Sequence, residues 1–166
     1  PAIVWQDRRS SSICDALAHH GPRLAHLTGL ELDPYFVAPK MAWLRERVAA
    51  QLTITTTDTW LLHRLCGAFV SDVATAGRTL LLDLETGSWS DEACAIFGLH
   101  AADLPTVVGN AQPLGECSTF GGNVPITGAC VDQQAALFAE GCHTAGEAKC
   151  TYGTGAFMLA CTGSTP

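Results

Sequence analysis

The sequence predicts an α/β layered domain with a helical insertion, and two observations carry that prediction. Short apolar runs typical of strands are interspersed with segments whose apolar residues recur at helical spacing. Hydrophobic residues make up 48% of the 166 residues and charged residues only 15%, a composition that favours a buried core over a disordered chain. A purely β fold or a purely helical bundle would not combine the two patterns.

The first part of the chain indicates a strand followed by helices. Residues 2–5 are a short apolar run of strand type, and Asp7 can cap a helix over about 8–20 that ends at Gly21. Pro39 to Gln51 then carries apolar residues on one helical stripe.

A third helix is expected over residues 55–65, with Trp60, Leu61 and Leu65 on its inner face and Gly67 at its end. The elements expected beyond it are, in order, a strand over 80–84 with a turn at 86–87, a helix from Ser90, turns over 105–125, a strand over 124–131, a helix over 132–140 ended by Gly141, and a hairpin over 149–161.

Charge and cysteine usage restrict the partners and the compartment. The net charge is −7, and two lysines with seven scattered arginines make no strip able to neutralise a run of phosphates, so nucleic acid is not an expected partner. No window of about 18 apolar residues predicts a membrane span. Eight cysteines without a CxxC pair predict reduced thiols, a cytoplasmic protein and no cysteine-based metal site, with Cys130, Cys150 and Cys161 buried in a sheet.

Asp132 and Gln133 are the strongest candidates for chemistry. An apolar strand is expected to deliver them to the mouth of a sheet, where ligands of open α/β folds bind. A carboxylate there can take a proton from a substrate hydroxyl, and an amide can both donate to and accept from that hydroxyl. Asp is also among the best helix N-cap residues, so a purely structural role for Asp132 stays open.

Glycines and turn aromatics supply further candidates. Gly153, Thr154 and Gly155 form a Gly-Thr-Gly turn that can bring backbone amides and a hydroxyl close to a phosphate, although a hairpin turn without a ligand has the same pattern. Trp5, Tyr35 and Phe157 lie beside expected turns and can pack on the C–H faces of a polyol, while core packing remains the alternative.

Seven colinear blocks resemble the FGGY family of carbohydrate kinases, and within it the glycerol kinases. The blocks are IVWQDRR (3–9), TGLELDPYF (28–36), PKMAWLRE (39–46), TDTWLLHRLCG (57–67), SDVATAGRTLLLDLETGSW (71–89), VPITGACVDQQAALF (124–138) and TYGTGAFML (151–159).

The resemblance implies a ribonuclease-H-like (actin-like) fold and transfer of the γ-phosphoryl group of ATP, with Mg²⁺, to a small polyol such as glycerol. Asp132 matches the catalytic base, while Trp5, Tyr35, Gln133 and Phe157 match polyol-binding positions. The segment Gly153, Thr154 and Gly155 matches positions near the ATP phosphates. A homo-oligomeric full-length protein is expected.

The chain departs from the family in ways that affect these expectations. Nothing matches the phosphate loop whose aspartate organises Mg²⁺ and ATP, the Arg-Glu pair that binds glycerol, or the second domain. Residues 1–166 are therefore expected to be part of an N-terminal domain, inactive alone, with the Mg²⁺ ligands mostly outside it. Val131 stands where glycine is usual. An acceptor such as erythritol, xylulose or ribulose, or an inactive chain that only binds, stays an alternative.

Overall fold

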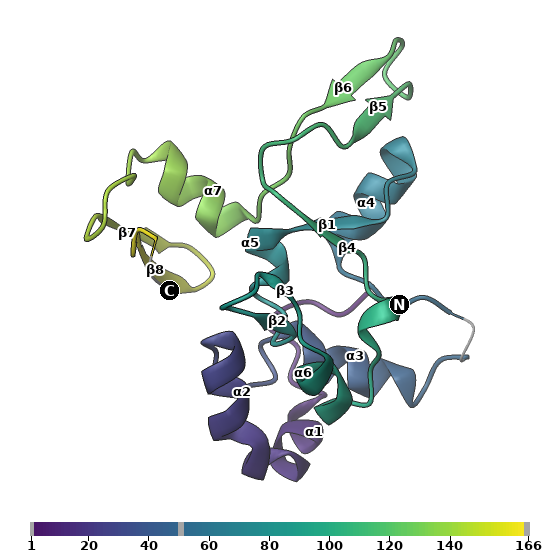
Figure 1. Ribbon diagram of the computed structural model, residues 1–166, viewed down its shortest axis with the longest axis vertical. Coiled ribbons are helices and arrows are strands. Elements are labelled where there is room, and N and C mark those ends of the chain that lie inside the picture. The colour runs from purple at the N-terminus through teal and green to yellow at the C-terminus, as the bar shows by residue number, and fades with distance from the viewer. Residues whose placement is uncertain (1, 50–51, 165–166) are drawn as a thin grey trace. The chain divides into compact units, whose positions relative to one another are not determined.

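The computed structural model describes residues 2–49 and 52–164, and the chain divides into two compact units, Pro1–Ala129 and Cys130–Pro166. Figure 1 shows the helices and strands of both units. The helices of the first unit are α1 (Ser11–Ala16), the 3-10 turn η1 (Ala18–His20), α2 (Gly21–Thr28), α3 (Val37–Arg45), α4 (Thr57–Cys66), α5 (Val73–Ala76), α6 (Asp91–Ile96) and the 3-10 turn η2 (Ala101–Asp103).

The strands of the first unit are short and form three separate pairs. They are β1 (Val70–Asp72), β2 (Leu82–Asp83), β3 (Ser88–Trp89), β4 (Thr106–Val108), β5 (Gly115–Cys117) and β6 (Val124–Ile126). Strands β1 and β4 pair in parallel, while β2 with β3 and β5 with β6 pair antiparallel.

The hydrophobic core of the first unit forms where α2, α3 and α6 enclose the apolar run around β2. Its buried members are Leu24, Ala38, Met41, Ala42, Leu80, Leu81, Ala93, Cys94, Phe97 and Leu99. Leu80 adopts a left-handed backbone with φ of 67° and is completely buried. Such a conformation is strained for a leucine, so the packing around this side chain must hold the chain reversal before β2 in place.

The ends of several elements confirm the local signals. Gly67 ends α4 with φ of 77°, and Gly87 closes the β2–β3 hairpin with φ of 64°. The Ser90 hydroxyl caps α6 by accepting a hydrogen bond from the Ala93 amide at 3.2 Å.

Four expectations near the N-terminus are wrong. Residues 2–5 form no strand, because the chain turns at once through a hydrogen bond from the Asp7 amide to the Val4 carbonyl. Asp7 caps no helix, since its carboxylate binds Arg9 instead. Gly21 begins α2 rather than ending a helix, with a right-handed backbone that continues the helical path. Helix α3 ends at Arg45, and residues 50–51 of the expected helix lie outside the described residues.

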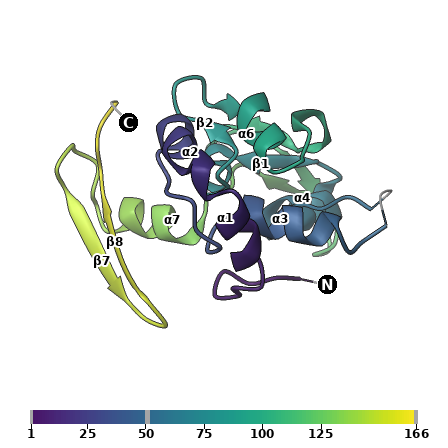
Figure 2. The ribbon, with the colours of Figure 1, turned by 90° about the horizontal axis from the view of Figure 1, so that it is seen from below.

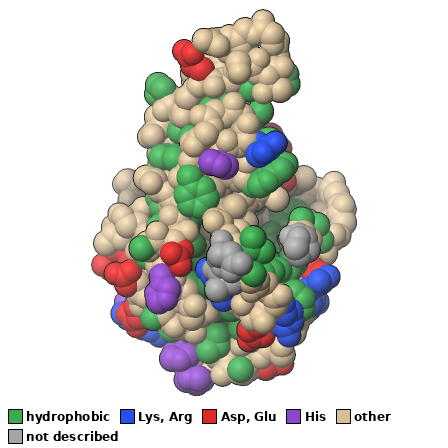
Figure 3. All heavy atoms as spheres, turned by 90° about the vertical axis from the view of Figure 1, so that its right-hand side faces the viewer, with side chains coloured by type: hydrophobic (Ala, Val, Ile, Leu, Met, Phe, Trp, Pro, Cys, Tyr) green, Lys and Arg blue, Asp and Glu red, His purple; other side chains and the backbone are tan. Residues whose placement is uncertain are grey.

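The inner face of α4 also differs from the expectation. Thr59 and Leu62 are buried, whereas Trp60 is 60% and Leu61 49% exposed. Figure 3 shows that hydrophobic side chains reach the surface on one face of the protein. Burial of α4 is thus set by its contacts with β1 and β5, which the local pattern does not specify.

Two further segments differ from the expected secondary structure. The expected turn region 105–125 contains β4 and β5, so it is not purely loop. The strand expected over 124–131 ends at Ile126, and residues 127–131 are irregular. In both places three-residue strands are too short to display an alternating pattern.

The second unit consists of one helix and one hairpin, both expected from the sequence. Helix α7 (Asp132–Ala139) is followed by β7 (Ala148–Tyr152) and β8 (Ala156–Ala160), which pair antiparallel, and Figure 2 labels all three. The register places Lys149 opposite Leu159 and Thr151 opposite Phe157. These four residues share one face of the hairpin and are more buried than their strand neighbours.

All eight cysteines are free of disulfide bonds in the structure. Cys14, Cys94 and Cys117 are buried, but Cys130 and Cys150 are exposed and Cys161 is half-buried, so the expected burial of these last three in a sheet is wrong. Cys150 points to the open face of β7, and Cys130 lies in the irregular segment before α7. In the part of the chain that the structure describes, every helix is too short or too polar to cross a membrane.

Candidate functional site

Trp5 and Tyr35, two of the three aromatic candidates, lie against each other in the first unit. Their ring centroids lie 5.7 Å apart in an edge-to-face arrangement, and Tyr35 meets Phe36 in the same way at 5.1 Å. The Arg78 guanidinium lies 5.8 Å from the Tyr35 ring centroid and 5.0 Å from that of Phe36. Edge-to-face aromatic pairs are favourable, so this arrangement holds Tyr35 in place.

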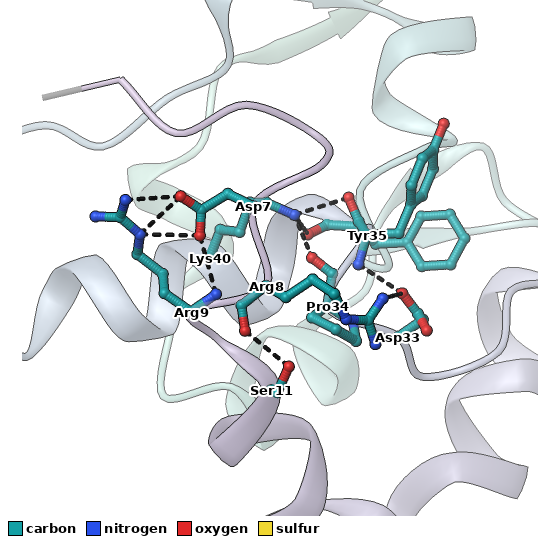
Figure 4. Close-up of polar contacts among 9 residues, drawn as sticks. Asp7, Arg8, Arg9, Ser11, Asp33, Pro34, Tyr35 and Lys40 are labelled. Atoms are coloured by element: carbon teal, nitrogen blue, oxygen red, sulfur yellow. Dashed lines mark hydrogen bonds and ion pairs between the residues drawn. The ribbon is translucent and has the colours of Figure 1, made fainter. Parts of the chain in front are cut away.

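The turn that carries Tyr35 is built around the buried side chain of Lys40, which is 6% exposed (Figure 4). The Lys40 Nζ donates to the backbone carbonyl oxygens of Pro34, of Tyr35 at 2.9 Å and of Phe36 at 3.4 Å. The Asp33 carboxylate accepts from the Tyr35 amide at 2.7 Å on the other side of the turn. Burial lowers the pKa of the Lys40 ammonium, and the carboxylates of Asp7 and Asp33 oppose that shift.

The loop that follows Trp5 is tied to the same turn. The Asp7 carboxylate accepts from the backbone amide and the Nε of Arg9, and these hydrogen bonds lower the pKa of Asp7. The Arg8 guanidinium lies 3.9 Å from the Asp33 carboxylate (Figure 4). The Asp7 side chain is half-buried, but those of Arg8, Arg9 and Asp33 are exposed to solvent, so the ion pairs contribute little to stability. They serve to orient the loop beside the turn.

Asp132 is the first residue of α7, and its carboxylate is exposed. Its Oδ1 accepts a hydrogen bond from the Gln133 amide at 2.7 Å. The N-cap residue is Val131, whose side chain makes no capping bond, so Asp132 acts on the helix start from the first helical position. The expectation that a strand delivers Asp132 directly is wrong, because residues 127–131 separate it from β6.

The amide of Gln133 is held from the hairpin. The Nζ of Lys149 donates to Gln133 Oε1 at 2.5 Å and to Thr151 Oγ1 at 2.6 Å. Lys149 is only 5% exposed, while Gln133 and Thr151 are half-buried. Phe157 lies on the same face of the hairpin as Lys149 and Thr151. The second unit therefore places two of the predicted polyol-binding residues, Gln133 and Phe157, on the same side of the hairpin.

The Gly-Thr-Gly turn joins β7 to β8 at an exposed position. Its hydrogen bond runs from the Gly153 amide to the Gly155 carbonyl at 2.9 Å, so the Gly153 amide is used within the turn. Thr154 is exposed, and a Cβ added to Gly153 would meet no atom within 4 Å. The Thr154 hydroxyl is thus accessible at the tip of an open turn.

Sequence reasoning missed the two lysines, which are the only lysines of the chain. Lysine is almost never fully buried unless its charge is paired, yet both are buried against neutral oxygens. Their positions in the sequence could have indicated a role near the site, because Lys40 closely follows the block that contains Tyr35 and Lys149 closely precedes the Gly-Thr-Gly turn. A second network was also missed, in which the buried Asp72 accepts from Asn110 Nδ2 at 2.8 Å.

The described residues do not by themselves fit a Mg²⁺ site. Across residues 2–49 and 52–164, no three His, Cys, Asp or Glu side chains are grouped so that they could hold a metal ion. Mg²⁺ prefers several oxygen ligands, and a single exposed Asp132 carboxylate does not provide them.

Comparison with known proteins places the chain in one family. The model of the FGGY family of carbohydrate kinases, N-terminal domain, matches residues 1–139. A curated glycerol kinase from Myxococcus xanthus is 44% identical over 99% of this chain and 36% of its own length. This chain therefore spans about a third of the length of the curated relatives it matches.

Solved structures agree with the family match. The crystal structure of Plasmodium falciparum glycerol kinase with ADP is 33% identical, with a TM-score of 0.88 over 95% of this chain and 34% of that one. A xyloylose kinase from Brucella ovis is 26% identical, with a TM-score of 0.85 over 95% of this chain and 35% of that one. The fold is thus that of these kinases, as the sequence resemblance implied. On the family match over most of its length, the chain belongs to the FGGY family of carbohydrate kinases.

Proposed function

We propose that these residues are part of the N-terminal domain of a longer kinase that transfers the γ-phosphoryl group of ATP to a hydroxyl of glycerol. The observation that carries this proposal is the 44% identity to a glycerol kinase across the whole chain, with Asp132, Gln133 and the Gly-Thr-Gly turn present. The ADP bound to the Plasmodium falciparum glycerol kinase supports ATP as the phosphoryl donor. Free thiols and ATP use fit the cytoplasm.

In the proposed reaction, Asp132 is the general base and Gln133 binds the acceptor. The acceptor oxygen attacks the γ-phosphorus, the bond from that phosphorus to the β,γ-bridging oxygen breaks, and ADP leaves. The hydroxyl proton passes to the Asp132 carboxylate, which is exposed and close to the Gln133 backbone. Because such transition states are loose, positioning and charge neutralisation supply most of the rate, and a base contributes about 10²–10⁴-fold.

By their match to the family's polyol-binding positions, Trp5 and Tyr35 of the first unit and Phe157 of the second unit would each contact the polyol, and Thr154 with Gly155 would approach the phosphates. The edge-to-face packing of Trp5 on Tyr35 supports the first role, and the exposure of Thr154 supports the second. Mg²⁺, when bound, would neutralise phosphate charge, and we expect its ligands from parts of the kinase other than these residues. An oligomeric kinase remains a prediction.

Turnover by the full-length protein tests the proposal directly. ADP release would be measured with glycerol, erythritol, xylulose and ribulose, and glycerol is expected to give the highest kcat/KM. The likeness to the Brucella ovis xyloylose kinase makes a five-carbon sugar the main alternative, and faster turnover with xylulose would favour it. The chain of residues 1–166 alone is expected to release no ADP.

The role of Asp132 is tested by Asp132→Asn, which keeps an oxygen able to accept the Gln133 amide bond but cannot take a proton. We expect kcat to fall at least ~10²-fold with little change in melting temperature. Asp91→Asn is the matched control, because Asp91 is likewise the exposed first residue of a helix, α6. If the kcat of Asp132→Asn stays within about threefold of wild type, Asp132 is not the base and only stabilises the start of α7.

A further inference from the structure

We propose that Lys149 is a positioning residue that fixes the Gln133 amide in one orientation, with its oxygen on the ammonium and its NH₂ group presented to the acceptor hydroxyl. This inference rests on the proposed function, and it adds a residue and a direction of hydrogen bonding to it. The contacts that carry it lie entirely within the second unit.

The ammonium group of Lys149 determines which atom of Gln133 faces it. Lys149 carries only donors, so the atom of Gln133 that lies 2.5 Å from Nζ must be the oxygen. The Oγ1 of Thr151, at 2.6 Å, accepts a second hydrogen bond from the same nitrogen. A charged donor makes a stronger hydrogen bond than a neutral one, and it favours this amide orientation over the flipped one.

The Lys149 side chain is buried. Lys149 is 5% exposed, so water does not replace the amide oxygen easily, and the ammonium depends on neutral oxygens for solvation. An apolar side chain at this position of β7 would avoid that cost. The ammonium therefore has a function other than filling the space between α7 and the hairpin.

The orientation of the Gln133 amide decides which group it offers to the substrate. Because Gln133 Oε1 faces Lys149, only the Nε2 group of Gln133 is available to contact the substrate hydroxyl. This group can donate a hydrogen bond but cannot accept one. Gln133 would therefore only donate to the hydroxyl, whereas the sequence predicts that it both donates and accepts. A hydroxyl oxygen that accepts from Gln133 keeps its own proton available for the Asp132 carboxylate, and polarisation of the amide by the ammonium strengthens the donor.

The test uses the full-length kinase with glycerol and compares Lys149→Met, Gln133→Ala and the double variant. Lys149→Met is expected to lower kcat/KM for glycerol about 10- to 100-fold, while KM for ATP changes less than about threefold. In the Gln133→Ala background the same change is expected to lower kcat/KM less than about threefold, because Lys149 acts through Gln133. Effects that multiply, or a parallel rise in KM for ATP, would overturn the positioning role.

Gln133→Glu tests the orientation itself and guards against a Lys149→Met variant that does not fold. Glutamate can still accept from Lys149 but has no NH₂ group, so kcat/KM for glycerol is expected to fall to the level of Gln133→Ala with an unchanged melting temperature. Activity near wild type would mean that the acceptor faces an oxygen of residue 133, and would refute the proposal.

Leu159→Ala is the control for general damage to the hairpin, since Leu159 is the cross-strand neighbour of Lys149. It is expected to lower the melting temperature without changing KM for glycerol more than about threefold. A wild-type kinase inactive with every polyol and sugar would refute the proposed function, and with it any substrate role of Lys149. An active wild type in which Leu159→Ala reproduces the Lys149→Met kinetics would refute the positioning role alone.

Discussion

Replacement of Asp72 should destabilise the first unit more than replacement of any exposed Asp or Glu. Asp72 is completely buried at the end of β1, and its carboxylate accepts from the Thr75 amide at 3.0 Å, the Thr75 hydroxyl at 2.6 Å and Asn110 Nδ2 at 2.8 Å. Asn110 Nδ2 also donates to the Ala129 carbonyl at 2.9 Å. One carboxylate thus joins β1, the start of α5 and the segment that follows β4.

The magnitude follows from the groups that Asp72→Ala leaves behind. A buried donor without an acceptor costs about 1–3 kcal/mol, and here two half-buried donors, the Thr75 amide and one Asn110 N–H, lose their acceptor. Release of the buried charge offsets part of that cost. We therefore expect a net loss of about 2–4 kcal/mol in the free energy of unfolding. Asn110→Ala should cost about 1–3 kcal/mol, because the carboxylate keeps the Thr75 donors.

Urea denaturation of the chain, followed by tryptophan fluorescence, measures both values. Asp83→Ala is the matched control, because the Asp83 carboxylate also accepts from two backbone amides, of Glu85 at 2.9 Å and Thr86 at 3.0 Å, but these hydrogen bonds are exposed at the turn after β2, where water can replace the carboxylate. It should cost about 1 kcal/mol or less. If Asp72→Ala destabilises no more than Asp83→Ala, the reasoning about this network is wrong.

Two further outcomes follow from the same unit. Burial raises the pKa of Cys14 and of Cys94 to about 11, so at pH 8 both should react with iodoacetamide far more slowly than the exposed Cys150, and equal rates by mass spectrometry would contradict this. Ser90→Ala removes the cap of α6 and should lower the free energy of unfolding by about 1 kcal/mol, whereas Ser88→Ala at an exposed position should change it by less than about 0.5 kcal/mol in the same urea titration.

Elements with local signals could be predicted from the sequence. The end of α4 at Gly67 and the start of α6 at Ser90 depend on one residue with a distinctive backbone or side-chain preference. The β7–β8 hairpin likewise follows from apolar runs on both sides of a glycine turn. Each signal acts within a few residues, so it survives without knowledge of the fold.

Elements that depend on distant partners could not be predicted. Strand β1 (Val70–Asp72) pairs in parallel with β4 (Thr106–Val108), and neither three-residue strand has a pattern of its own. Residues 2–5 show the opposite: their apolar pattern is typical of a strand, but among the described residues they have no strand partner, and the chain forms a turn.

The candidate site divides in the same way. The sequence blocks 28–36 and 124–138 identified Tyr35 and Gln133 as candidates, but they did not indicate which residues hold these side chains in place. The buried lysines are invisible to composition and periodicity, because lysine is normally exposed and its burial requires oxygens that the fold supplies. For Lys40 these are carbonyls of one turn, and for Lys149 they include Gln133 Oε1 from α7.

Gly128 lies in the irregular segment before α7, close to the backbone of Asn110. A Cβ added to Gly128 would lie 2.4 Å from the Asn110 carbonyl oxygen, a backbone atom that cannot swing away. The next residue is fixed by two bonds, from the Ala129 amide to the Asn110 carbonyl at 3.0 Å and from Asn110 Nδ2 to the Ala129 carbonyl at 2.9 Å. Gly128→Ala must therefore push the segment away from Asn110 and weaken both.

We expect Gly128→Ala to lower the free energy of unfolding by about 1–3 kcal/mol, the usual cost of overpacking and of lost hydrogen bonds. Hydrogen exchange at the Ala129 amide should become faster, because its acceptor moves away. Gly122→Ala is the control, since a Cβ there meets no atom within 4 Å, and its effect should stay within about 0.5 kcal/mol. Equal stability and unchanged exchange in Gly128→Ala would mean that the segment can shift without losing Asn110, and that glycine is not required at this position.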